Sequence, residues 1–263
     1  MNDQVLAVQT ESLTRRFDKL VAVDHLNLTV PRGVIFGFLG PNGAGKSTTI
    51  NMLIGLLPPT EGTARVGGFD IRRQPLEVKR RIGVVPEQLS LYERLTAVEQ
   101  IELVGRLHGL SPTEIKQRIP QLLELLELED SAGKMILDYS AGMRKKTAMA
   151  CAFIHAPEIL FLDEPFESID PISTKAIKEV LRDMVERRGT TIFFSTHVME
   201  LAERFCDEVG IINKGQLVAV GGIPALRQQA GLPESASLED VFIETVGGEV
   251  EDEGLLGWLT GRD

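Results

Sequence analysis

A glycine-rich loop between an apolar run and a helical pattern constrains this chain more than any other part of its sequence. Residues 34–39 are almost continuously apolar, as is typical of a strand that is buried on both faces of a parallel sheet. Residues 48–57 have the pattern of a helix that ends before Pro58-Pro59. The loop between them fits the phosphate-binding pattern G-x-x-x-x-G-K-[ST] and consists of Gly40, Pro41, Asn42, Gly43, Ala44, Gly45, Lys46 and Ser47.

Each fixed position of this loop has a chemical task. The glycines let backbone N–H groups turn toward phosphate oxygens, Lys46 places a positive charge against the β- and γ-phosphates, and the Ser47 hydroxyl can bind Mg²⁺. The helix that begins near Thr48 directs its N-terminus at the anion. A loop that only turns a strand into a helix is the simpler interpretation, but the strand and helix that the motif requires are both present. We therefore expect residues 40–48 to bind ATP.

Two adjacent carboxylates follow a second apolar run. Residues 160–162 are Leu-Phe-Leu, and Asp163 and Glu164 come directly after them. A carboxylate at a strand end can hold Mg²⁺, and its neighbour can orient or deprotonate an attacking water molecule. Two acids can also simply mark the end of a strand, but the phosphate loop favours the catalytic interpretation. We predict that Asp163 binds Mg²⁺ and that Glu164 is catalytic.

Strand and helix patterns alternate along most of the chain, which predicts an α/β fold with a parallel sheet. Apolar residues between 89 and 136 instead recur at helical spacing, and Ser111-Pro112 begins a capped helix in which we expect a kink at Pro120. This region is predicted to be a helical lobe inserted in the sheet domain. Elsewhere we predict a helix at 172–187, and strands within 5–37 and at 159–162, 191–194, 209–212 and 216–220.

Composition and charge narrow the classes of function. The chain of 263 residues suits one large domain or two small lobes. A net charge of −10 argues against a nucleic-acid partner, since phosphate contacts call for a basic face. The two cysteines lack the short spacing of a zinc site or a disulfide framework. The sequence offers neither a signal-peptide pattern nor about 18 consecutive apolar residues, so we expect any membrane anchor to be another chain.

The stretch from Tyr139 to Lys146 resembles the LSGGQ signature of the ATP-binding cassette (ABC) ATPases. It reads Tyr-Ser-Ala-Gly-Met-Arg-Lys-Lys and precedes the acid pair at that family's usual separation. The phosphate loop, the signature and the acids in this order make residues 5–245 resemble an ABC ATPase domain. The resemblance implies a P-loop NTPase (RecA-like) fold, with a parallel sheet core, an N-terminal antiparallel β subdomain and an α-helical subdomain at about 89–150.

The resemblance also implies roles for residues outside these motifs. Phe17 matches the aromatic residue that stacks on adenine, and Val23 matches a small apolar residue that supports the ring. Glu87 stands where the family has a glutamine, and it is expected to contact Mg²⁺ together with Ser47 and Asp163 and to link to a transport partner. His197 matches the family's switch histidine, although a lone histidine at a strand end is more often structural.

The signature further implies a second copy of the chain. Ser140 is a good cap for a helix over 141–153, whose N-terminus is an anion site. Since the chain already has a phosphate loop, Ser140 and Gly142 are expected to bind the ATP of another copy, or of a homologous cassette, in a head-to-tail dimer. Residues 168–170 match the loop that crosses this interface. Three departures from the family pattern leave the turnover rate open: Ala141 for glycine, and Met143 and Glu87 for glutamine.

Met143, the Pro86-Glu87 pair and residues 237–242 resemble the exporter-type (ABC-2-like) cassettes, which pair with a polytopic membrane subunit. We therefore expect an ATP-hydrolysing subunit, peripheral on the cytoplasmic side of the cell membrane, that drives export of a substrate the sequence does not identify. The alternative is a soluble ABC ATPase of an assembly system, of the iron–sulfur scaffold type. Residues 246–263 are acidic, and we predict a flexible tail there.

Overall fold

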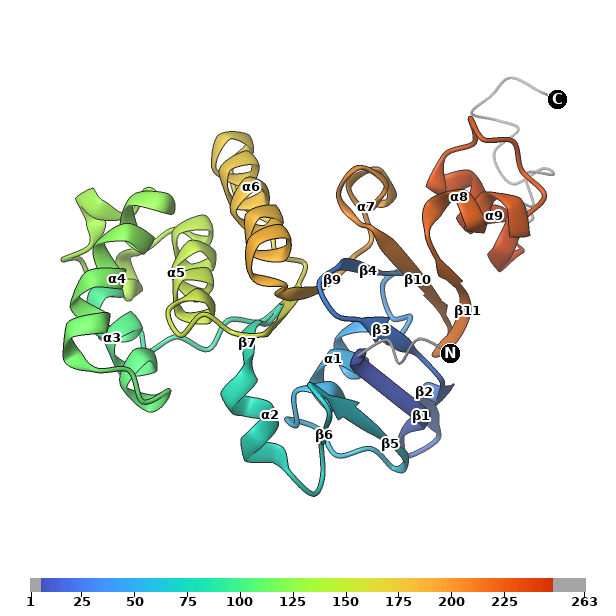
Figure 1. Cartoon of the computed structure of the whole chain (residues 1–263), viewed down its shortest axis with the longest axis horizontal. Helices are drawn as coiled ribbons and strands as arrows, with labels where there is room; N and C mark the ends of the chain where they lie inside the picture. The colour runs from blue at the N-terminus through green and yellow to red at the C-terminus, as the bar shows by residue number, and fades with distance from the viewer. Residues whose placement is uncertain (1–5, 248–263) are drawn as a thin grey trace, which may run out of the picture.

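A six-stranded sheet forms the centre of the molecule in the computed structural model, which describes residues 6–247 (Figure 1). Neighbouring strands from β10 to β7 are parallel, and β11 runs antiparallel to β10. The predicted parallel α/β sheet is therefore confirmed, and the strands predicted at 159–162, 191–194, 209–212 and 216–220 agree with the observed ones to within about two residues at each end. In spatial order the strands are β11 (Gln216–Gly221), β10 (Glu208–Asn213), β4 (Ile35–Leu39), β9 (Thr191–Thr196), β8 (Ile159–Asp163) and β7 (Ile82–Val85).

The central strands are held by side chains that are buried on both faces of the sheet. Every residue of β4, β8 and β9 is buried. Phe193 of β9 lies between two neighbours, with ring centroids 5.4 Å from Phe36 of β4 and 5.4 Å from Phe161 of β8. Aromatic pairs of this kind add about 0.5–1.5 kcal/mol each beyond the area that they bury. They fix the parallel strands whose carboxyl ends carry the predicted site.

A smaller antiparallel sheet packs on the same core, as the family resemblance implied. Val8 of this sheet and Phe36 and Phe38 of β4 belong to one cluster of buried side chains. The order of its strands is β2 (Leu20–Leu26), β1 (Leu6–Phe17), β5 (Glu61–Val66) and β6 (Phe69–Asp70), and β3 (Thr29–Pro31) also pairs with β1.

Helix α1 (Lys46–Leu53) begins two residues earlier and ends four residues sooner than the helix predicted over 48–57. Gly55 has a φ of +73°, and the N–H groups of Leu56 and Leu57 both donate to the carbonyl of Asn51, at 2.9 and 3.0 Å. A glycine in the left-handed region turns the chain and satisfies the last carbonyls of the helix. The helix therefore ends at this turn and not at the prolines.

Three helices lie between β7 and β8 in the chain and gather at one side of the molecule, away from the antiparallel sheet (Figure 1). They are α3 (Ala97–Leu107), α4 (Pro112–Leu125) and α5 (Ala141–Phe153), with two short 3₁₀ turns, η1 (Glu129–Ser131) and η2 (Ile136–Asp138), between α4 and α5. Ser111 and Glu114 form the predicted capping box of α4, and Pro120 lies inside this helix without ending it.

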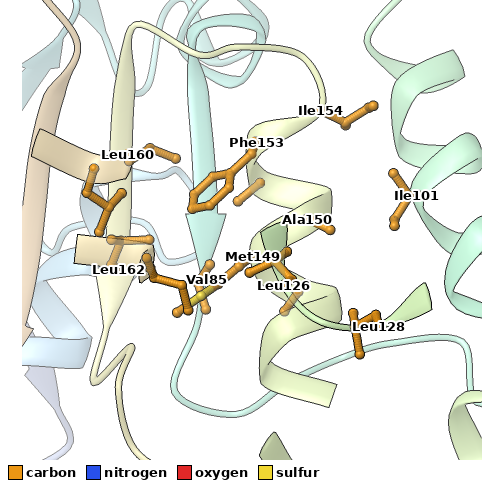
Figure 2. Packing of buried hydrophobic residues seen from close by; sticks show 14 of the residues in the cluster. Val85, Ile101, Leu126, Leu128, Met149, Ala150, Phe153, Ile154, Leu160 and Leu162 are labelled. Atoms are coloured by element: carbon orange, nitrogen blue, oxygen red, sulfur yellow. The ribbon is translucent and has the colours of Figure 1, made fainter. Parts of the chain in front are cut away.

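Helix α5 joins these helices to the sheet. Figure 2 shows Met149 and Phe153 of α5 facing Val85 of β7 and Leu160 and Leu162 of β8. All of these side chains are buried in one cluster, which continues to Ile101 of α3 on the other side of α5. Since each buried aliphatic or aromatic side chain contributes about 1.5–3 kcal/mol, this cluster fixes the position of α5 against the strand that ends in Asp163.

The other helices cover the sheet or follow its last strand. Helix α6 (Pro171–Arg188) extends the predicted helix by one residue at each end, with Asp170 as N-cap and Gly189 at φ +67° as C-cap. The remaining helices are α2 (Pro75–Arg81), α7 (Met199–Phe205), α8 (Ile223–Gln229) and α9 (Leu238–Val246). None of the helices within residues 6–247 is long and apolar enough to cross a membrane. The predicted acidic tail at 246–263 lies outside the described residues except for its first two.

Candidate nucleotide site

The phosphate loop occupies the turn between β4 and α1, and its glycines are needed for steric reasons. A Cβ atom on Gly40 would lie 2.3 Å from the carbonyl oxygen of Ile212, and one on Gly45 would lie 2.4 Å from that of Ala22. Gly43 and Gly45 also have φ angles of +79° and +107°, which side chains rarely allow. Backbone carbonyls of Ile212 and Ala22 therefore border the loop, and glycines at these two positions leave room for them.

Lys46, the first residue of α1, is buried beneath the loop. Its Nζ donates to the carbonyl oxygens of Gly40, at 2.8 Å, and Pro41, at 3.2 Å, and lies 4.0 Å from Oε1 of Glu164. Burial lowers the pKa of Lys46, while the carboxylates of Glu164, Asp163 and Glu87 act in the opposite direction. The ammonium group is thus held between the loop and a cluster of acids.

Asp163 lies at the end of β8 and is 4% exposed. The Ser195 hydroxyl at the end of the adjacent β9 donates to its carboxylate. Burial raises the pKa of Asp163, whereas hydrogen bonds with Ser195 and Ser47 lower it. The Ser47 hydroxyl in turn donates to Oε2 of Glu87 at 3.1 Å. The structure therefore brings Ser47, Glu87 and Asp163 together, as predicted for metal ligands.

Glu164 follows Asp163 and pairs with the predicted switch histidine. Oε1 of Glu164 lies 2.8 Å from Nδ1 of His197. The backbone N–H of Glu164 donates to the carbonyl and the hydroxyl of Ser195, at 3.2 and 3.3 Å. Glu164 has a φ of +45°, a conformation that is costly for a residue with a side chain and that recurs at functional sites. These contacts fix the direction of its carboxylate toward the phosphate loop.

A cavity of about 600 Å³ opens over the loop. Phe17, which is 41% exposed, lies at its apolar part, and the polar part holds Lys46, Glu87, Glu164 and His197. An aromatic ring with an open face beside a phosphate loop can hold the base and the triphosphate of one nucleotide. The full lining is Phe17, Leu20, Val21, Ala22, Asn42, Gly43, Gly45, Lys46, Ser47, Thr48, Glu87, Glu164, Glu167, His197, Lys214 and Gly215.

Some predicted residues lie away from the cavity surface. Val23 is fully buried in the core, and Leu20, Val21 and Ala22 of the same strand region line the cavity instead. Asp163 lies behind Ser47 and Glu87. Lys214 and Gly215 were not predicted, because the turn between β10 and β11 is remote in sequence and reaches the site only through the fold. Its sequence signal, Asn-Lys-Gly, indicates a turn but not its neighbour.

The predicted signature residues lie elsewhere on the chain. Ser140 caps α5, and its hydroxyl accepts from the N–H of Met143 at 3.2 Å, as the sequence predicted. A Cβ atom on Gly142 would lie 2.5 Å from the carbonyl oxygen of Ser168. Neither Ser140 nor Gly142 is among the described residues that line the cavity. The anion site of α5 is therefore separate from the phosphate loop of its own chain.

The loop from Glu164 to Asp170 is tied to α5 by an ion-pair network. Lys146 of α5 is buried, and its Nζ lies 3.3 Å from Oδ2 of Asp170 and 3.1 Å from Oε2 of Glu127. The Ser173 side chain and backbone, followed by Lys146, lower the pKa of Asp170. The signature helix and the loop predicted to cross a dimer interface therefore form one packed unit.

Comparison with known proteins gives a consistent set of relatives. A sequence profile described as ABC transporter matches residues 23–167. The linearmycin resistance ATP-binding protein LnrL of Bacillus subtilis (strain 168) is 38% identical over 214 residues, or 81% of this chain and 68% of that protein. The daunorubicin/doxorubicin resistance ATP-binding protein DrrA of Streptomyces peucetius is 38% identical over 232 residues, or 88% of this chain and 70% of that protein.

Solved structures agree with these relatives. One, described as the ATP-binding subunit of an ABC transporter, has a TM-score of 0.86 at 33% identity and covers 91% of this chain and 99% of that chain. Another is a dimeric post-hydrolysis state of an ATP-binding cassette bound to ADP and phosphate. It has a TM-score of 0.76 at 26% identity and covers 82% of this chain and 98% of that chain.

Proposed function

This chain belongs to the ABC transporter family, and we propose that, as the ATP-hydrolysing subunit of such a transporter, it powers the export of an antibiotic-like compound through a separate membrane subunit. The substrate class follows from the names of its relatives, which record resistance to linearmycin and to daunorubicin and doxorubicin. The alternative of iron–sulfur assembly receives no support from these relatives. The observation that carries the proposal is the convergence of loop, acids and aromatic ring on one cavity.

We propose that ATP lies along this cavity with its triphosphate on residues 40–48 and its base against Phe17. Lys46 already points into the loop, where its ammonium group would neutralise the β- and γ-phosphates. Val23, buried behind the wall formed by Val21 and Ala22, would support the base region from within.

The donor set beside the loop fits Mg²⁺. The Ser47 hydroxyl and the carboxylates of Glu87 and Asp163 offer only oxygen, which this ion prefers. No group of three or more His, Cys, Asp or Glu side chains within residues 6–247 is arranged to hold a metal on its own. We therefore infer that phosphate oxygens and water complete the ligand shell. When bound, the ion offsets negative charge on the phosphates.

Glu164 is proposed as the group that activates water. Its carboxylate is held by His197 at 2.8 Å and lies 4.0 Å from Lys46, so it stands next to the expected position of the terminal phosphate. A carboxylate in this place can accept a proton from the attacking water molecule. His197, which also lines the cavity, is proposed to keep the carboxylate oriented and to contact the terminal phosphate.

The second half of the site is proposed to come from a second copy, or from a homologous cassette. Ser140 and Gly142 stand at the N-terminus of α5, where N–H groups and the helix dipole favour an anion. They do not line the cavity of their own chain. A head-to-tail dimer would bring them to the ATP of the partner, and a dimeric cassette is among the similar solved structures.

Glu87 adds a negative charge beside the proposed phosphate site, and the chain offsets it with two buried lysines. Burial lowers the pKa of both Lys46 and Lys145, and Glu87 is one of several carboxylates that act in the opposite direction. Lys145 of α5 donates to the carbonyl oxygen of Asp163 at 3.3 Å. We propose that this arrangement keeps Glu87 able to serve Mg²⁺ and to link the site to the membrane subunit.

We propose the cytoplasmic face of the membrane as the working position of this chain, held there by its membrane subunit. We also propose the domain division predicted from the sequence, with an ATPase domain at 5–245 and its helical subdomain at about 89–150.

Co-expression with a candidate membrane protein from a neighbouring gene tests the export proposal. We expect the tagged chain to retain that protein through purification in detergent. Cells that contain both should survive several-fold higher concentrations of linearmycin or daunorubicin than cells with Lys46→Ala, which keeps the partner but loses ATP binding. Purification in a soluble complex without a membrane protein, or equal survival of the two strains, would contradict export.

A further inference from the structure

The guanidinium group of Arg15 lies over the ring of Phe17, with Cζ 4.5 Å from the ring centroid. Both residues are in β1, two positions apart, beside a break in the register between β1 and β2 at Arg15 and Arg16. Nη1 of Arg15 also donates to the carbonyl oxygen of Pro58 at 2.9 Å. The carbonyl of Pro58 therefore holds one end of the guanidinium group, which lies over the aromatic ring.

The two faces of the Phe17 ring have different surroundings. Phe17 lines the cavity, whereas Arg15 is not among the lining residues. Nε of Arg15 is inaccessible to solvent and has no hydrogen-bond partner among residues 6–247. A guanidinium group over an aromatic ring is stabilised by the negative charge of the ring face. The arginine therefore covers the face that is turned away from the nucleotide cavity.

From this geometry we propose that Arg15 is a positioning residue for the adenine base. The inference rests on the proposed stacking of adenine on Phe17. By covering the back of the ring, Arg15 holds it at one angle, so less motion is lost when a base stacks on the front. The cation also draws electron density from the ring, which favours stacking with an electron-rich purine. Arg15 itself touches neither base nor phosphate.

The chain contains a matched control on the same strand. Arg16 is adjacent to Arg15, but its Nε lies 3.5 Å from Oε1 of Glu61. It has the same charge, yet no cation–π contact with the Phe17 ring is found for it among the described residues. Loss of Arg16 therefore reproduces the change in charge without the change in support for the ring.

Calorimetric titration of the purified full-length chain with Mg²⁺-ATP and with Mg²⁺-tripolyphosphate tests the proposal. Tripolyphosphate binds the phosphate loop but has no base. We expect Arg15→Ala to weaken ATP binding about 5- to 10-fold and to leave tripolyphosphate binding unchanged, since base stacking contributes about 1–3 kcal/mol in all. Arg15→Lys, which keeps the charge but not the plane, should weaken ATP binding less, and Arg16→Ala should change neither affinity.

Three outcomes would overturn the proposal: unchanged ATP binding by Arg15→Ala, an equal loss for ATP and tripolyphosphate, or an equal loss from Arg16→Ala. The second outcome also reports a folding defect, and Arg15→Lys then repeats the test in a milder variant. Phe17→Ala distinguishes a failure of the proposed stacking on Phe17 from a failure of the role of Arg15. If it leaves ATP binding unchanged, the stacking role of Phe17 fails. If it weakens ATP binding and Arg15→Ala adds a further loss in that background, only the role of Arg15 fails.

Discussion

His155 stacks its imidazole on that of His108, where the chain after α5 meets the end of α3. The ring centroids are 3.6 Å apart and the planes differ by 14°. Nε2 of His155 lies 3.0 Å from the carbonyl oxygen of Ile82, and Nδ1 is buried without a partner among residues 6–247. Burial first, and then the neighbouring His108, lower the pKa of His155 to about 4. At this site the fold accommodates the neutral ring and opposes its protonation.

Acid is therefore expected to destabilise the fold through His155. The unfolded chain takes up this proton near pH 6.5, while the folded chain does not until about pH 4. The contribution is complete above pH 6.5 and is lost as the pH falls toward 4. We expect this to lower the free energy of unfolding by about 2 kcal/mol across that window. His155→Phe should flatten the pH dependence of the free energy of unfolding in urea titrations, and a slope equal to that of the wild type would contradict this.

At the same scale, the residues of the site that the sequence predicted are those whose roles depend on their near neighbours. Lys46 and Ser47 follow their glycines directly, and Glu164 follows Asp163, so a local pattern was enough to predict them. Lys214 and Gly215 line the cavity only because β10 pairs with β4, across more than 150 residues of sequence. The contact of Arg15 with Phe17 was not predicted either, because the irregular pairing of β1 with β2 at this point decides how the side chains lie. No local signal carries such information.

Among the elements, α5 connects the signature to the rest of the site. Its C-terminal half packs on β7 and β8 (Figure 2), and its N-terminus packs on the loop at 164–170. Gly142 is the point of closest approach, because its Cα faces the carbonyl oxygen of Ser168. The sequence alone predicts only a role in phosphate binding for this glycine. The structure adds a second reason for glycine, which is the packing of α5 on its own chain.

Substitution of Gly142 should consequently cost stability even without nucleotide. A Cβ atom at 2.5 Å from a backbone oxygen forces α5 or the loop to move, at a cost of about 1–3 kcal/mol. Gly142→Ala should therefore unfold at lower urea concentration than the wild type. Ala141→Gly, one residue away at an exposed position, should cost no more than about 1 kcal/mol through helix propensity. If both variants unfolded like the wild type, the packing of Gly142 on Ser168 would not be tight.

The limits of the elements were harder to predict than the elements themselves. The end of α1 was predicted at the prolines because they are the stronger signal, yet a glycine turn ends the helix at Leu53. At this point two local signals compete, and the hydrogen bonds of the glycine turn decide where the helix ends. The kink at Pro120 stays a prediction, and the helix continues through this proline to Leu125.

For the whole molecule, the alternation of strands and helices predicted the parallel sheet, because this pattern has few solutions. The incompleteness of the ATP site within one chain is also a property of the whole molecule. The phosphate loop lies at the carboxyl edge of the sheet, and the signature lies on a helix outside the cavity lining. The ATP site is therefore half a site, and we propose that ATP joins two copies, with its phosphates between Lys46 of one and Ser140 of the other.

The molecular mass of Glu164→Gln by light scattering at saturating Mg²⁺-ATP tests this account most directly. This variant keeps the donors that bind phosphate and loses the carboxylate that activates water, so turnover should fall at least about 100-fold while bound ATP persists. We predict twice the monomer mass with ATP, and monomer mass without nucleotide. The combination with Lys46→Ala should stay monomeric under both conditions. A monomer of Glu164→Gln with ATP bound at its site would contradict the proposed dimer joined by ATP.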